Sequence, residues 1–100
     1  MRAIIIDPFL REVREAEIEN SLGEFQYIVG GGYLEFGVWI NNREPLYVND
    51  FAHWKQRFLI GTSHVFSGCG LIVGGDGKGE ARGARVPLVE IRNVVRFPAV

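Results

Sequence analysis

The sequence predicts an α+β fold: a mainly antiparallel sheet of about five strands with two short helices, about 21–29 and 87–96, packed on one face of it. Three observations predict it: short runs with strand-like alternation, two stretches with apolar residues at helical spacing, and turn residues between them. The chain has 100 residues, of which 47% are apolar and 23% charged. This composition is typical of one globular domain, which we expect to span 1–100.

The first two strands are predicted near the N-terminus. Residues 2–6 are rich in β-branched side chains and run into Asp7-Pro8, a pair that starts turns. Residues 13–19 alternate apolar and charged side chains, the period of a half-exposed strand. We therefore expect the two segments to pair as a hairpin.

The first helix is predicted at 21–29. Ser21 to Glu24 fit a capping box, in which the serine hydroxyl and the glutamate carboxylate each accept a hydrogen bond from a backbone N–H at the helix start. Three glycines, 30–32, can adopt positive φ and end the helix. The apolar residues at helical spacing are Leu22, Phe25, Ile28 and Val29.

The middle of the chain alternates short extended segments with turns. The asparagine-rich segment 41–45 and the glycine-rich segment 74–79 are predicted turns. Strands or short extended pieces are expected at 33–40, 46–48, 58–60, 64–66 and 69–73, with a ragged returning strand over 80–86.

The second helix is predicted at 87–96. Pro87 suits the first helical position, where its missing N–H costs nothing. Leu88, Ile91 and Val95 then fall on one stripe, and Arg92 and Arg96 are spaced as a solvated face.

Charge is distributed unevenly along the chain, whose net charge is −1. Residues 1–50 hold nine acidic and four basic residues, a net of −5, and residues 51–100 hold three acidic and seven basic residues, a net of +4. The low net charge argues against binding of a nucleic-acid polymer. The asymmetry has two interpretations: the halves attract each other, or the second half offers a basic face to an anionic ligand.

The single cysteine, Cys69, excludes an internal disulfide. The N-terminal apolar run is too short for a signal peptide, and no run reaches the roughly 18 apolar residues of a membrane span. We therefore expect a cytoplasmic protein with no membrane partner.

The motifs of catalysis and cofactor binding are incomplete. The glycine-rich turn lacks the Walker pattern, because Ile72 stands six residues before Lys78 and Gly79 follows it. His53, His64 and Cys69 lack the close spacing of metal ligands. Cys69, flanked by glycines in an apolar run, is expected to be an inert buried thiol. The sequence thus predicts no catalytic residue, no metal, no cofactor and no enzymatic activity.

Residues 47–57 are the richest in recognition chemistry. Aromatic rings can stack on a base, and amide or cationic side chains can hold its edges or a phosphate. The same residue types form the hot spots of protein interfaces, and they also anchor loops on a core. The candidate ligand-binding residues are Tyr47, Asn49, Asp50, His53, Trp54, Lys55, Arg57 and His64.

The order of motifs resembles a known family. It consists of a capped helix ending in Val29-Gly30-Gly31 before Tyr33-Leu34-Glu35, then Tyr47-Val48-Asn49 with an acidic residue next, then Gly70-Leu71-Ile72-Val73-Gly74 before a glycine-rich turn and a short C-terminal helix. Over nearly the whole chain this is similar to the small phage and mobile-element proteins grouped as domain of unknown function 3846. Residues 51–68 depart from the family pattern, being longer and more aromatic. The resemblance implies a phage-encoded accessory protein acting on host processes, in the host cytoplasm, and supplies no catalytic residues.

Three functional hypotheses follow. The first is a non-enzymatic protein that sequesters a small anionic, nucleotide-like ligand, such as a host-defence signal, with Trp54 or Tyr47 stacked on the base and Lys55 and Arg57 offsetting its charge. The second is an inhibitor or adaptor that captures a host protein. The third is a weak hydrolase using His53, His64 or Cys69. A homo-oligomer is expected in each case, because short strands leave exposed sheet edges.

Overall fold

The computed structural model describes residues 1–49, 54–75 and 80–99 and confirms the predicted α+β class. Within these residues two helices accompany eight strands in two antiparallel sheets. The larger sheet has the order β2-β1-β7-β4-β3, and the smaller has the order β6-β5-β8. The elements are β1 (Arg2–Asp7), β2 (Glu12–Glu17), α1 (Leu22–Ile28), β3 (Glu35–Ile40), β4 (Glu44–Val48), β5 (Arg57–Ile60), β6 (His64–Ser67), β7 (Gly70–Ile72), α2 (Leu88–Val94) and β8 (Val95–Arg96).

The predicted N-terminal hairpin is confirmed. β1 and β2 pair antiparallel from Arg2 opposite Glu17 to Asp7 opposite Glu12. The turn between them is held by Asp7, whose Oδ1 accepts hydrogen bonds from the backbone N–H of Phe9 at 2.9 Å and of Leu10 at 3.1 Å. β1 also pairs with β7, so it lies inside the larger sheet.

Both faces of the larger sheet are covered, because β1 is apolar on both sides. Ala3 and Ile5 belong to a core cluster with Phe25 and Val29, which lie in or next to α1. Ile4, between them in the strand, points to the opposite face, as the two-residue period of a strand requires.

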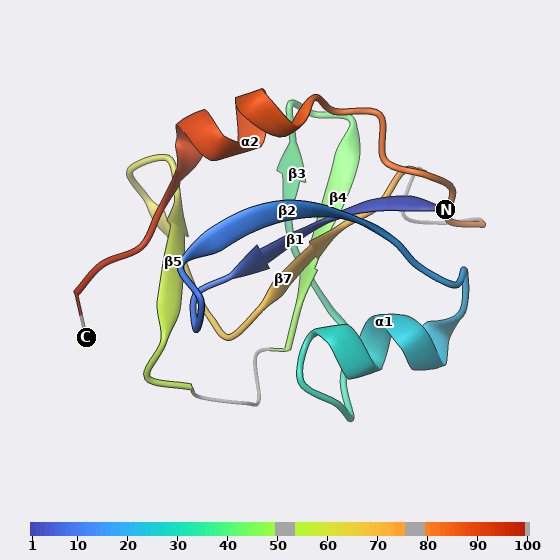
Figure 1. Ribbon diagram of the computed structural model, residues 1–100, viewed down its shortest axis with the longest axis horizontal. Coiled ribbons are helices and arrows are strands. Elements are labelled where there is room, and N and C mark those ends of the chain that lie inside the picture. Colours follow the sequence, from blue (N-terminus) through green and yellow to red (C-terminus); the bar gives the residue numbers. More distant parts are fainter. Residues whose placement is uncertain (50–53, 76–79, 100) are drawn as a thin grey trace.

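The second core lies between the larger sheet and the smaller one. Ile4 packs there in one cluster with Phe58 and Ile60 of β5 and with Ile91 of α2. The two helices therefore lie on opposite sides of the larger sheet (Figure 1). The expectation that both pack on one face is wrong, because β1 is apolar on both sides and each side of the sheet therefore needs cover.

Local signals set the ends of α1. Ser21 Oγ accepts from the backbone N–H of Glu24 at 3.2 Å, as the capping box predicts. Glu24 Oε2 accepts from the N–H of Glu19, two residues before the cap, at 3.4 Å. Gly30, which follows the C-cap Val29, has a φ of 111°, so a residue without Cβ ends the helix there.

The C-terminal segment differs from the prediction. Pro87 precedes α2 as its N-cap, and the helix ends at Val94 rather than residue 96. Val95 and Arg96 instead pair with Ile60 and Leu59 of β5. The ragged strand expected over 80–86 is reduced to one bridge, between Gly74 and Arg82.

Candidate functional site

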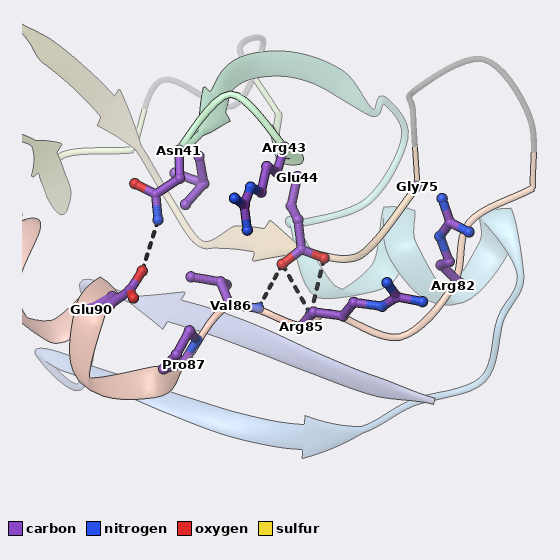
Figure 2. A pocket seen from close by; sticks show the side chains of 10 residues that line it. Asn41, Arg43, Glu44, Gly75, Arg82, Arg85, Val86, Pro87 and Glu90 are labelled. Atoms are coloured by element: carbon purple, nitrogen blue, oxygen red, sulfur yellow. Dashed lines mark hydrogen bonds between the residues drawn. The ribbon is translucent and has the colours of Figure 1, made fainter.

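The strongest candidate site is a pocket between the β3–β4 turn and the segment 82–87 that leads into α2 (Figure 2). Its volume is about 520 Å³, within the range of small-ligand sites. We call it the arginine pocket. The polar side chains that line it are Asn41, Arg43, Glu44, Arg82, Arg85 and Glu90.

Glu44 fixes the floor of the arginine pocket. It is only 7% exposed, and its carboxylate accepts three hydrogen bonds from backbone N–H groups. Arg85 donates to Oε2 at 3.0 Å and to Oε1 at 2.9 Å, and Val86 donates to Oε1 at 2.7 Å (Figure 2). These donors satisfy the buried charge, as a carboxylate away from water requires.

Arg2 holds the same segment from its other side. Its Nη1 donates to the carbonyl oxygens of Ala84 at 2.8 Å and Val86 at 2.9 Å. Its Nη2 donates to Glu15 Oε1 at 2.8 Å, and this contact, followed by the charge of Arg2, lowers the pKa of Glu15 below its ordinary 4.5. The backbone that carries Arg85 is therefore anchored through both its N–H and its carbonyl groups.

The cations of the pocket are available to a ligand. Arg43, Arg82 and Arg85 are exposed, and none forms an ion pair with any part of the chain that the structure describes. Both lining carboxylates are already bonded, since Glu90 Oε2 accepts from Asn41 Nδ2 at 2.7 Å. In Figure 2, Arg43 lies on one side of the Glu44 carboxylate and the other two arginines on the other side. The lining thus offers charge-assisted donors at separated points.

A second pocket, of about 500 Å³, lies beside Trp54 on the α1 side of the larger sheet. We call it the Trp54 pocket. Its lining combines Arg14, Tyr27, Gly30, Gly31, Trp54 and Cys69 with two isoleucines. Arg14 is engaged there, because its Nη1 lies 3.0 Å from both Asp7 Oδ2 and Glu12 Oε1.

Cys69 is a protonated thiol at neutral pH. Burial raises its pKa to about 11, the negative charge of Asp7 and a hydrogen bond to it add to the rise, and the charge of Arg14 opposes it. Because the thiolate is the nucleophile and the metal ligand, this environment disfavours both kinds of chemistry at neutral pH.

The structure gives two of the predicted site residues structural contacts. Asn49 is buried, and its Nδ2 donates to the carbonyl oxygen of Gly31 at 2.6 Å. Tyr47 is half-buried against the core cluster under α1. Asp50 and His53 lie outside the described residues.

The other predicted residues do not gather in one place. Trp54 lines the second pocket, whereas Lys55 and Arg57 are exposed and line neither pocket. His64 pairs with Ile60 at the far end of the β5–β6 hairpin from Arg57. Arg57 and Ile60 are three residues apart in β5, about 10 Å along the strand.

Sequence reasoning missed the three arginines of the arginine pocket. The available signal was the basic excess of the second half, to which Arg82 and Arg85 contribute. Arg82 and Arg85 lie near Arg43 because Glu44 contacts residues 85–86. No local sequence pattern predicts that contact.

Over the described ranges, no group of three His, Cys, Asp or Glu side chains is placed to hold a metal ion. No described helix is long and apolar enough to cross a membrane.

Comparison with family models, with curated proteins and with solved structures finds no match to this chain. The resemblance to domain of unknown function 3846 therefore stays a prediction.

Proposed function

We propose that this protein binds, without transforming it, a small ligand carrying more than one anionic group, and that the arginine pocket is its site. One observation carries the proposal: three exposed guanidinium groups without an ion-pair partner among the described residues surround one hollow. Guanidinium groups match phosphate and carboxylate in geometry and bind both bidentately. A phosphorylated, nucleotide-like compound fits this donor set.

The pattern of ion pairs supports the proposal. The ion pairs among residues 1–49, 54–75 and 80–99 all lie within residues 1–17, joining Met1, Arg2 and Arg14 to carboxylates of β1 and β2. Arg92 donates instead to the Val13 carbonyl oxygen, at 3.0 and 3.2 Å. The described cations of the second half therefore form no ion pair with acidic side chains of the first half.

The placement of the pockets changes the mode of binding expected from the sequence. The arginine pocket is lined by Ile40 and Val86 of one core cluster, whereas the Trp54 pocket is lined by Ile5, which belongs to the other. A small nucleotide cannot reach both faces of a sheet. We therefore propose that the phosphates bind the arginines and that Trp54 does not hold the base of this ligand.

The test is thermal unfolding with inorganic pyrophosphate, ATP and a cyclic dinucleotide as probes. A ligand that binds only the folded state adds about 2.7 kcal/mol at a hundred times its Kd, or about 11–22 °C in Tm for a domain this small. We expect Arg82→Gln and Arg85→Gln each to weaken the effective probe about tenfold, since each removes a charge-assisted contact.

Arg57→Gln is the matched control, because it removes the same charge from an exposed arginine outside the pocket. It should leave the affinity within about twofold at constant salt. The proposal fails if no probe raises Tm, or if Arg57→Gln weakens binding as much as the pocket variants do.

A host-protein inhibitor remains the second candidate, favoured by an apolar patch at the β1–β2 turn. Phe9 and Leu10 are 46% and 65% exposed, and the Phe9 ring meets the Trp54 ring edge-on at 5.5 Å. Exposed aromatic clusters are typical of interface hot spots. In that case Phe9→Ser abolishes capture of a host protein and leaves any anion-dependent rise in Tm unchanged.

The resemblance to phage proteins suggests where such a ligand would come from. We propose a nucleotide-type host-defence signal, sequestered in the host cytoplasm, as the first ligand class to test after the simple probes.

A further inference from the structure

We infer that the Trp54 pocket is a second binding site, which takes an uncharged or cationic planar ring. This site is independent of the arginine pocket, because it lies on the other face of the larger sheet and shares no lining residue with it.

The Nε1 edge of the Trp54 ring lies against glycine backbone. A Cβ on Gly68 would collide with the ring, and a Cβ on Gly30 would lie 3.3 Å from Nε1. The N–H of Gly68 donates to the Gln56 carbonyl oxygen at 2.9 Å, which ties the segment following Trp54 to the same backbone. The edge of the ring is thus positioned by backbone before any ligand arrives.

Aromatic surface remains exposed around this hollow. Trp54 is 40% exposed, and Tyr27, which α1 carries to the pocket, is 80% exposed. Exposed aromatic rings beside a hollow can stack on a planar ligand, and such stacking tolerates different bases.

Charge distinguishes the ligand of this pocket from that of the arginine pocket. Arg14 lies between the carboxylates of Asp7 and Glu12, so the three groups together carry a formal charge of −1. Cys69 contributes a neutral thiol. An anionic ring therefore meets no unpaired cation in this lining, whereas an uncharged or cationic ring suffers no repulsion.

The experiment measures the fluorescence of the Trp54 indole ring. The chain has two tryptophans, so Trp39→Phe leaves Trp54 as the sole indole fluorophore. Adenosine and 1-methylnicotinamide serve as the uncharged and cationic probes, and AMP is the anionic counterpart of adenosine. We expect saturable quenching by at least one of the first two, with AMP at least fivefold weaker than adenosine if adenosine binds.

Two further variants on the Trp39→Phe background locate the quenching. Tyr27→Ala should weaken the bound ring about fivefold, as expected for loss of one stacked aromatic contact. Leu22→Ala is the matched control, because Leu22 is 60% exposed on the same helix and does not line the pocket. The movement of the Trp54 indole N–H signal in NMR spectra on adding the probe gives a second readout.

The outcomes also separate this inference from the proposed function. Arg85→Gln should leave the Trp54 titrations unchanged while weakening anion binding. The inference is overturned if neither ring quenches saturably, if Tyr27→Ala has no greater effect than Leu22→Ala, or if AMP binds as tightly as adenosine.

Discussion

Glu44 shows how one buried residue can organise the arginine pocket. Its buried carboxylate gathers the N–H groups of Arg85 and Val86, so it sets the distance between β4 and the segment that carries two of the pocket arginines. Burial of a carboxylate is costly unless donors replace water, and here backbone N–H groups do so. The pocket arginines therefore remain without a carboxylate partner among the described side chains.

We expect Glu44→Gln to lower the free energy of unfolding by about 2 kcal/mol, because the amide loses the charge and its NH₂ group cannot accept the N–H of Arg85. Urea denaturation measures the change. Glu90→Gln is the control, since an exposed glutamine keeps an oxygen for Asn41 and should cost under about 0.5 kcal/mol. Equal stabilities of the two variants would show that the Glu44 contacts do not hold the fold.

Cys69 gives a prediction that depends on pH. Because its pKa is raised to about 11 and only the thiolate reacts, the rate of alkylation by iodoacetamide in the folded protein should rise about tenfold per pH unit from 8 to 10. Burial is the largest cause of the raised pKa and the charge of Asp7 is the next, so Asp7→Asn should speed the reaction at pH 8. The urea-unfolded chain, with a thiol near its ordinary 9.0, is the reference. A rate that levels off below pH 9 in the folded protein would contradict the raised pKa.

At the scale of elements, the predictable features were those encoded within a few residues. The Ser21 cap of α1 and the alternation of β2 each lie inside one short segment, and both appear in the structure. The reciprocal bond of the capping box does not form as predicted, because Glu24 accepts from the N–H of Glu19 rather than from that of Ser21. The end of α2 lies elsewhere than predicted because β8 pairs with β5, and Ile60 is 35 positions before its partner Val95. A β-branched pair such as Val94-Val95 offers little helical preference to oppose that pairing.

Local sequence patterns also could not predict which face of the larger sheet each helix covers. The apolar stripe of α2 indicates that the helix packs on something, and Ile91 is indeed fully buried. The stripe does not say whether it faces Ile4 or Ile5, which point to opposite faces of the same strand. The arginine pocket was missed for the same reason, because the β3–β4 turn and the segment 82–87 that line it meet only through long-range contacts.

At the scale of the whole molecule, the edges of the larger sheet differ in protection. β2 carries charged side chains at Glu12, Arg14, Glu15 and Glu17, the usual defence of an edge against further strand pairing. β3, at the opposite edge, instead exposes Phe36 and Trp39 at 48% and 40%, with their rings 5.1 Å apart. The less protected edge is therefore the aromatic one.

We expect two copies of the chain to associate through β3, which would extend the sheet and cover both aromatic rings. Light scattering on the eluting protein at about 100 μM should then give twice the chain mass of 11.2 kDa. Trp39→Lys should shift the mass to that of one chain, because it places like charges together across a two-fold axis. Val65→Lys, at the 55% exposed edge residue of β6, is the matched control and should leave the dimer intact. If the unaltered protein has the mass of one chain at every concentration, β3 does not mediate dimerisation. If Val65→Lys dissociates the dimer, the interface lies on the smaller sheet instead.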